Sequence, residues 1–189
     1  MCIRDSIKLC SALKNQYGFD AISLMPTNLY GYGDNYHPSN SHVLPAMLSK
    51  FYKAKIKGSK EVLCWGTGAP KREFLFVDDL AEAAIFVLEK VSIKHKSLYD
   101  DSENFVGILN VGTGTDITIK ELAKVISSIV GYEGNIIWDS SKPDGTPRKL
   151  LDVSKLHKMG WTAKTELKEG IKFTLNSYIE QVYKNKIRN

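Results

Sequence analysis

Side chains that can move protons or bind anions are concentrated in three polar stretches, at residues 26–43, 65–78 and 142–152. The first contains His42, whose imidazole titrates near neutrality and could donate a proton at working pH. The second contains Trp65, which offers a flat apolar face and one N–H donor, and Arg72, whose planar guanidinium can bind phosphate through two parallel hydrogen bonds. These residue types are compatible with acid–base chemistry on a ligand that carries phosphate.

Each of these residues also has a purely structural interpretation. His42 could be a helix-start histidine satisfied by the loop backbone, and Trp65 could belong to the core. Lys50 could be an exposed helix lysine, and Asp144 an ordinary residue of a Pro-Asp-Gly turn. No cluster of His, Cys, Asp and Glu has the spacing of metal ligands, so we predict no metal site.

Apolar periodicity places the three stretches between alternating strands and helices, which indicates an α/β fold. We expect strands at 21–25, 62–65, 108–111 and 135–138, and an extended segment at 72–77. Helices are expected at 7–17, 43–53, 78–91, behind a Thr118–Glu121 capping box, at 152–159 and at 166–183, with Asp78 as the cap of the third. Residues 139–149 are expected to form a Pro/Gly-rich loop. Pro26 to Gly31 leave the carboxyl end of a strand, where parallel α/β proteins bind ligands.

Composition excludes several classes of protein. The 189 residues are 43% hydrophobic and 25% charged, with no run of the ~20 apolar residues that a membrane span needs. The net charge of +5 indicates a lysine-rich surface or a site for an anion such as a nucleotide, and the dispersed lysines argue against nucleic acid. Cys2, Cys10 and Cys64 are scattered, which favours a reducing, cytoplasmic compartment.

Three longer motifs resemble the GDP-L-fucose synthases, which are extended short-chain dehydrogenases/reductases. They are Met25-Pro26-Thr27-Asn28-Leu29-Tyr30-Gly31 with His37-Pro38-Ser39-Asn40-Ser41-His42-Val43, then Trp65-Gly66-Thr67-Gly68 with Arg72-Glu73-Phe74-Leu75 and Val77-Asp78-Asp79, and Lys142-Pro143-Asp144-Gly145-Thr146-Pro147-Arg148-Lys149-Leu150-Leu151-Asp152. The resemblance implies the carboxy-terminal part of an NAD(P)-binding Rossmann-like fold with a smaller substrate-binding α/β domain. Residues 7–40 would be a remnant of the Rossmann domain, and residues 41–189 mainly the substrate-binding domain with returning Rossmann elements.

The same resemblance implies an activity and a set of site residues. Members of this family use NADPH to convert GDP-4-keto-6-deoxy-D-mannose to GDP-L-fucose by 3,5-epimerisation and 4-reduction, as homodimers. His42 matches the family's catalytic histidine and contacts the cofactor. Further cofactor contacts fall on Pro26, Thr27, Asn28 and Leu29, and substrate contacts on Lys50, Trp65, Arg72, Asp144 and Lys149.

The sequence also departs from the family pattern. The Gly-rich fingerprint, the catalytic Ser, Cys and the Tyr-x-x-x-Lys pair are missing, and the lysine of that pair would fall at Ile3. We therefore expect residues 1–6 to be a non-native start, the chain to be inactive alone, and strand 21–25 to leave an unpaired edge that promotes association. Two alternatives remain: a related nucleotide-sugar dehydratase or 4-epimerase that does not need His42, and a non-catalytic GDP-sugar-binding module.

Overall fold

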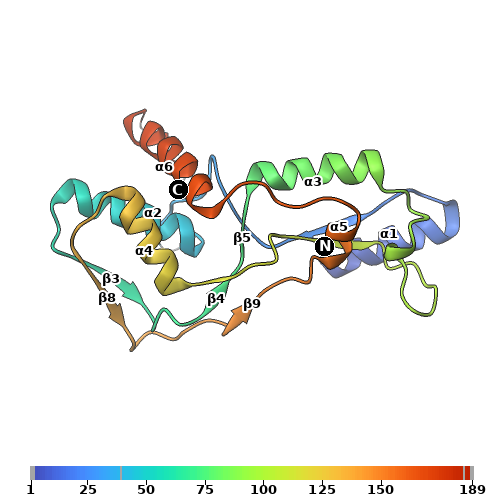
Figure 1. The fold of residues 1–189 in the computed structure, drawn as a ribbon, viewed down its shortest axis with the longest axis horizontal. Helices are drawn as coiled ribbons and strands as arrows, with labels where there is room; N and C mark the ends of the chain where they lie inside the picture. Colours follow the sequence, from blue (N-terminus) through green and yellow to red (C-terminus); the bar gives the residue numbers. More distant parts are fainter. Residues whose placement is uncertain (1–2, 39, 185, 188–189) are drawn as a thin grey trace.

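The strands of this protein pair across long sequence separations, mostly in parallel (Figure 1). The structure is a computed structural model that describes residues 3–38, 40–184 and 186–187. Within those residues, nine short strands alternate with six α-helices and one 3-10 helix, which confirms the α/β prediction. The molecule is elongated, with α2, α4 and α6 grouped at one end and α1, α3 and α5 at the other.

One packed region is built on two parallel strand pairs. β1 (Ser23–Pro26) pairs with β6 (Ile108–Val111), and β2 (Asn28–Tyr30) pairs with β5 (Phe74–Phe76). α3 (Val77–Lys90) and α5 (Ser154–Lys158) belong to the same region. Its buried core consists of Leu75, Ala83, Val87, Val91, Leu98, Leu109, Val111, Leu156 and Trp161.

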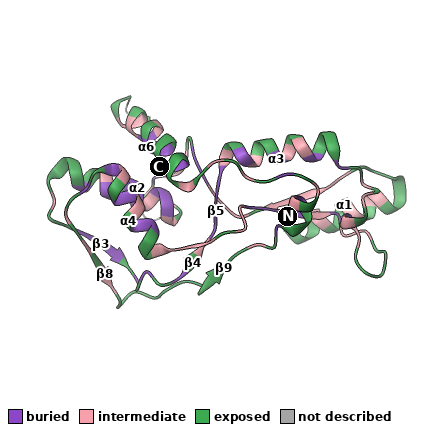
Figure 2. Ribbon diagram, viewed as in Figure 1, coloured by how far each residue is buried: buried purple, intermediate pink, exposed green. Residues whose placement is uncertain are grey.

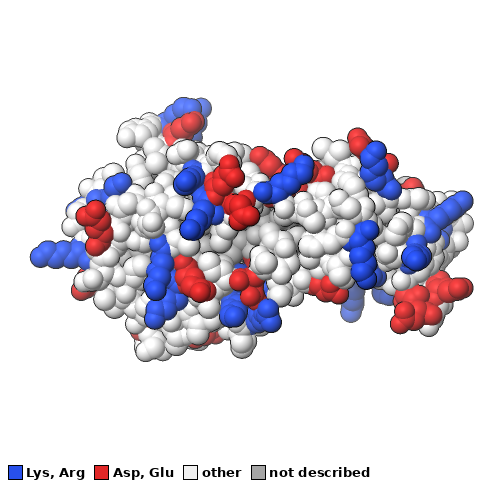
Figure 3. Space-filling view, viewed as in Figure 1, with Lys and Arg blue, Asp and Glu red and all other residues white. Residues whose placement is uncertain are grey.

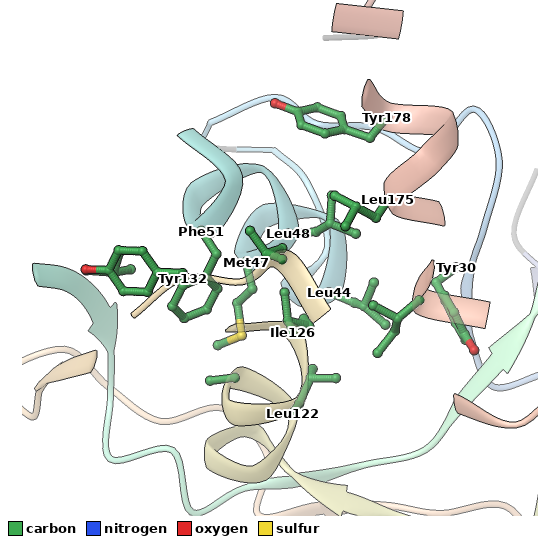
Figure 4. Close-up of a cluster of buried hydrophobic side chains, with 14 of the residues drawn as sticks. Tyr30, Leu44, Met47, Leu48, Phe51, Leu122, Ile126, Tyr132, Leu175 and Tyr178 are labelled. Atoms are coloured by element: carbon green, nitrogen blue, oxygen red, sulfur yellow. The ribbon is translucent and has the colours of Figure 1, made fainter. Parts of the chain in front are cut away.

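The second region packs three helices against a parallel pair, β3 (Glu61–Trp65) with β8 (Asn135–Asp139). The helices are α2 (Val43–Lys57), α4 (Ile119–Val130) and α6 (Leu167–Tyr183). Their apolar stripes meet in one cluster, shown in Figure 4. Residues that are at most 1% exposed in this cluster include Leu44, Leu48, Phe51, Leu122, Ile126, Ile171 and Tyr178. At roughly 1.5–3 kcal/mol per buried large apolar side chain, this cluster is the main stabilising contact of the second region.

A small three-stranded sheet connects the two regions. β4 (Lys71–Arg72) lies between β7 (Ile117–Thr118), to which it is antiparallel, and β9 (Arg148–Lys149), to which it is parallel. Arg72 is directly opposite Lys149 in this register. The sheet matters for function because it fixes where the Arg72 side chain leaves the backbone.

Helix α1 (Ile3–Tyr17) has no buried residue (Figure 2). Lys14 lies over the rings of Tyr99 and Phe105, with Nζ 5.3 and 4.9 Å from the centroids. Strand β1 has one partner among the described residues, β6. This region therefore leaves apolar surface uncovered, including Ile3, Leu9, Tyr17 and Phe19.

Several predicted boundaries are corrected by the structure. The first helix begins at Ile3 and not at residue 7, the second reaches Lys57, and strand β1 is 23–26 instead of 21–25. The expected extended segment 72–77 is two strands in different sheets, divided at Glu73, and the expected loop 139–149 contains β8's end and β9. Met1 and Cys2, from the expected non-native start 1–6, lie outside the described residues.

Asp78 is not the cap of α3, contrary to the prediction. The cap position is Phe76, and no side chain bonds the first turn there. The neighbouring Asp79 is buried instead, and its carboxylate accepts the backbone N–H groups of Lys164 and Thr165 at 3.2 and 3.1 Å. Asp79 thus connects α3 to the segment before α6. The Thr118–Glu121 capping box of α4, by contrast, is confirmed with both reciprocal hydrogen bonds.

Candidate functional site

A cavity of about 680 Å³ lies between α2 and β3. Helix α2 buries one stripe against the core and turns the adjoining stripe to this cavity, which Val43, Met47 and Lys50 line from the helix side. Strand β3 supplies Cys64 and Trp65. The wall is therefore apolar at its base and basic along the helix.

A smaller cavity of about 210 Å³ adjoins the first and shares three lining residues with it, Val43, Trp65 and Ile119. Its other walls include Arg72 and Asp144. The two together are called here the α2–β3 cleft. Four of the five predicted substrate residues, Lys50, Trp65, Arg72 and Asp144, line this cleft although they are up to 94 residues apart in the sequence.

Trp65 is 67% exposed, so the core-packing interpretation of this residue is wrong. It ends β3, whose alternation buries Val62 and Cys64 and leaves Trp65 exposed, and Trp65 lines both cavities. Lys142 Nζ lies 5.9 Å from the centroid of the indole ring. A partly exposed indole at the junction of two cavities is available to stack on a planar ligand group.

Lys50 lies at the wall of the larger cavity and donates from Nζ to the backbone oxygen of Leu63 at 2.8 Å. This bond draws the ammonium toward β3 and the neighbouring thiol. Burial raises the pKa of the Cys64 thiol, and the positive charge of Lys50 acts in the opposite direction. Lys50 thus supplies a fixed positive charge at the cleft wall, with two of its three donors left for a ligand.

Arg72 and Asp144 are both held by local contacts. Arg72 Nη1 donates to the Lys71 oxygen at 2.7 Å, and Nη2 lies beside Gly145. Asp144 Oδ1 accepts the backbone N–H of Thr67 at 2.9 Å, and Oδ2 accepts the Thr67 hydroxyl at 2.6 Å. These hydrogen bonds lower the pKa of the Asp144 carboxyl below its ordinary value.

Lys149, the fifth predicted substrate residue, does not line either cavity of the cleft. It is exposed on β9, opposite Arg72 in the parallel register. Side chains at registered positions of adjacent strands point to the same face of a sheet. The structure therefore brings Lys149 beside Arg72, outside the cleft walls.

His42 occupies the cap position of α2 with extended backbone angles, and its carbonyl accepts the first helical bond, from Ala46 N at 3.0 Å. Its imidazole makes no side-chain cap bond and is exposed, so the expectation of a backbone-satisfied helix-start histidine is not met at the cap. The residues on either side, Ser41 and Val43, line the larger cavity. His42 therefore lies at the rim of the cleft.

The predicted cofactor segment, Pro26 to Leu29, leaves the carboxyl end of β1. Asn28 Nδ2 donates to the Glu73 backbone oxygen at 2.8 Å, and Thr27 Oγ1 donates to the same oxygen at 3.3 Å. Because the partner is an acceptor, the orientation of the Asn28 amide is fixed, and Oδ1 is the atom it presents to a ligand. Pro26 is exposed, whereas Leu29 packs against the core of the first region.

Glu73 is a positioning residue that the sequence analysis missed. It is 0% exposed, and its carboxylate accepts the N–H groups of Gly114 at 2.7 Å and Leu151 at 3.0 Å, with Thr113 Oγ1 at 3.4 Å. Its backbone oxygen holds Thr27 and Asn28. The residue that follows Arg72 thus ties the cofactor segment, the turn after β6 and the segment after β9 together. The signal in the sequence was a lone acidic residue between two strand residues, Arg72 and Phe74.

Comparison with known proteins gives this geometry a family context. Residues 5–100 match the model of the NAD dependent epimerase/dehydratase family. The chain is 53% identical over 177 residues to a probable GDP-L-fucose synthase 1 of Oryza sativa subsp. japonica, covering 93% of the chain and 50% of the relative.

Solved structures show the same fold. A GDP-6-OMe-4-keto-L-xylo-heptose reductase from C. jejuni superposes with a TM-score of 0.85 at 35% identity, over 94% of this chain and 59% of that one. A GDP-D-glycero-L-gluco-heptose synthase from Campylobacter jejuni, solved in the presence of NADPH, gives 0.80 at 33% identity, over 94% and 58%. The chain spans about half the length of the curated relatives it matches.

Proposed function

The chain belongs to the NAD dependent epimerase/dehydratase family, and from this premise we propose that it is the substrate-binding half of a GDP-L-fucose synthase. The whole enzyme would convert GDP-4-keto-6-deoxy-D-mannose to GDP-L-fucose with NADPH. One observation carries the proposal: Lys50, Trp65, Arg72 and Asp144 line one continuous cleft. The naming of relatives at 49–53% identity as GDP-L-fucose synthases supports this substrate over those of other nucleotide-sugar dehydratases and 4-epimerases.

The chemistry of the cleft suits a nucleotide-linked sugar. The indole of Trp65 and the apolar side chains of Val43 and Met47 offer a surface for a purine ring. Arg72 and Lys50 place positive charge on two walls, where diphosphate oxygens would be neutralised by charge-assisted hydrogen bonds. We propose that Lys149, beside Arg72, contributes further positive charge to the same diphosphate.

His42 is the proposed proton donor for epimerisation. It lies at the cleft rim, at the cap position directly before α2, and its side chain makes no cap bond. A base on the missing half of the enzyme would take the proton next to the carbonyl, and the imidazole would return one on the opposite face. This proton transfer requires the sugar to lie between His42 and the proposed diphosphate contacts, Arg72 and Lys50.

The segment Pro26 to Leu29 fits the nicotinamide end of a dinucleotide. It lies at the carboxyl end of a parallel strand, where such folds bind cofactors, and the Asn28 carbonyl oxygen is oriented by the bond of its amide to Glu73. That oxygen could accept a carboxamide N–H. NADPH, when bound, would supply the hydride for reduction. Asn28 and the backbone of Pro26 and Thr27 would orient the ring, and Leu29 would support the segment from the core.

The assembly and location of the whole enzyme are further parts of this proposal. A homodimer is proposed because α1 carries uncovered apolar side chains. A cytoplasmic location is proposed from the unpaired thiols of Cys10 and Cys64. No helix in the described residues is long and apolar enough to span a bilayer. In the proposed domain division, residues 7–40 would be a remnant of the Rossmann domain, and residues 41–189 would be mainly the substrate-binding domain with returning Rossmann elements such as β5 and β6.

Calorimetry with GDP tests the proposal on this chain directly. We expect binding in the micromolar range, with W65A about tenfold weaker because base–aromatic stacking is worth roughly 1–3 kcal/mol per base. L88A, which changes an 85% exposed side chain on α3, is the control and should bind as the parent does. The proposal is wrong if the folded chain shows no preference for GDP over ADP and W65A has no effect.

A further inference from the structure

Two connecting segments run side by side between the pair β3–β8 and the pair β4–β9 (Figure 1). Residues 66–70 lead from β3 to β4, and residues 140–147 lead from β8 to β9. Because β3 pairs with β8 and β4 pairs with β9, both segments start from one strand pair and end at the other. The two segments therefore determine the separation of Trp65, at the end of β3, from Arg72, in β4.

Backbone hydrogen bonds join the two segments at their ends. Gly66 N donates to Asp139 O at 2.9 Å, and Lys71 N donates to Pro147 O at 2.8 Å. Between these ends, among the described residues, the segments are joined through Thr67 and Asp144 alone. Both donors of Thr67 go to one carboxylate, which makes this contact bidentate. We call it the Thr67–Asp144 bridge.

The glycines on either side of Thr67 let this backbone segment approach the side chains of Asp144 and Trp138 closely. Gly66 has a φ of +78°, and a Cβ at this position would overlap Asp144 Oδ1. Gly68 has a φ of +74°, and its Cβ would lie 2.8 Å from the Trp138 ring. Glycine is needed at both positions for conformation and for space. The Thr67 hydroxyl also accepts Ala69 N at 3.1 Å, which fixes its own rotamer.

Asp144 and Gly145 line the smaller cavity together with Trp65 and Arg72, and Gly145 lies beside Arg72 Nη2. With the carboxylate already accepting two hydrogen bonds from Thr67, its position is set by residue 67. Movement of the segment 140–147 would displace this wall relative to both Trp65 and Arg72. The bridge thus controls the width of the space in which a planar base and a phosphate would be held.

We infer that Thr67 is a positioning residue for nucleotide binding, which acts by holding Asp144 and thereby setting the spacing of Trp65 and Arg72. This inference rests on the proposed function and deepens it, since it adds a residue without ligand contact to the GDP-binding half of the site. Asp144 then contributes mainly as a structural partner of Thr67, and only secondarily as a ligand contact.

The experiment measures GDP binding by calorimetry with variants of the same chain. T67V keeps the shape of the side chain and removes the hydroxyl; we expect affinity to fall about tenfold, the upper range for one lost hydrogen bond. T67S restores the hydroxyl and should bind within about twofold of the parent. T146V, a Thr to Val change in the neighbouring segment at an exposed residue, is the matched control and should not change affinity. T67A replaces T67V if the latter does not fold.

The double variant T67V/D144N separates the two possible roles of Asp144. If the bridge is the shared cause, the double variant binds no more weakly than the weaker single variant. If D144N weakens binding while T67V does not, Asp144 contacts the ligand directly and the inference is overturned. Absence of GDP binding by the parent chain would instead refute the proposed function, so the two failures are distinguishable.

Discussion

Replacing Glu73 with glutamine tests whether one buried carboxylate holds the turn after β6 and the segment after β9 together. The side chain is 0% exposed and accepts N–H donors from Gly114 and Leu151 on its two oxygens. Glutamine has the same shape but only one acceptor oxygen. Whichever way its amide turns, an NH₂ group faces one of the two N–H donors, so that one hydrogen bond is replaced by a donor–donor contact.

The expected loss follows from that geometry. Leaving one partly buried N–H without an acceptor costs about 1–3 kcal/mol, and we take ~2 kcal/mol for E73Q. E73A removes both acceptors and should cost about twice as much. For a chain of this length a loss of ~2 kcal/mol lowers the melting temperature by roughly 4–8 °C.

Urea unfolding followed by circular dichroism measures the free energy of unfolding of each variant. E133Q is the matched control: Glu133 is exposed, and its replacement should change the free energy by less than about 0.5 kcal/mol. The reasoning is refuted if E73Q is as stable as E133Q, since the hydrogen bonds of the carboxylate would then contribute nothing that an amide cannot supply.

Three other predictions concern the rim of the cleft, the bridge and the exposed helix. H42N in the complete enzyme should lower solvent deuterium incorporation at the epimerised carbons by about 10²–10⁴-fold while GDP affinity measured by calorimetry stays unchanged, and normal incorporation would show that His42 is not the proton donor. The Thr67 hydrogen bonds hold the pKa of Asp144 below its ordinary value of 3.8, so their contribution to folding stability is complete above that pH and is lost as the pH falls through the depressed pKa. When the melting temperature is measured as a function of pH, D144N should therefore lose less stability in acid than the parent does. An identical acid profile would contradict this. Leu9 is 50% exposed on α1, and L9E should reduce concentration-dependent association in size-exclusion chromatography, whereas a parent chain that is monomeric at all concentrations would show that this surface does not self-associate.

Local patterns predicted the elements whose causes are local. The Thr118–Glu121 box lies at the start of α4 as expected, because both partners are within one helical turn of each other. The strand at 108–111 was predicted with its observed bounds, because the apolar run that ends at Gly112 is too short for a helix.

The sequence predictions were wrong for side chains whose hydrogen-bond partners are backbone groups far away in the sequence. Asp78 was expected to cap α3, yet the buried carboxylate is that of Asp79, and its donors come from residues 164 and 165. Glu73 was read as part of one extended run for the same reason, because its donors belong to residues 114 and 151. Backbone N–H groups occur at nearly every residue, so no sequence pattern identifies which of them a carboxylate will find.

The residues of the candidate site were predicted individually through resemblance, but their connection required the structure. Arg72 and Glu73 are consecutive, and in extended backbone their side chains point to opposite faces. Arg72 therefore reaches the α2–β3 cleft, while Glu73 turns inward to the core and its carbonyl holds Thr27 and Asn28. A displacement of this dipeptide would move the proposed phosphate contact and the proposed cofactor segment together. Stability lost at Glu73 should consequently appear as weakened ligand binding on both sides, which distinguishes it from a change at Thr67, whose effect is confined to the cleft.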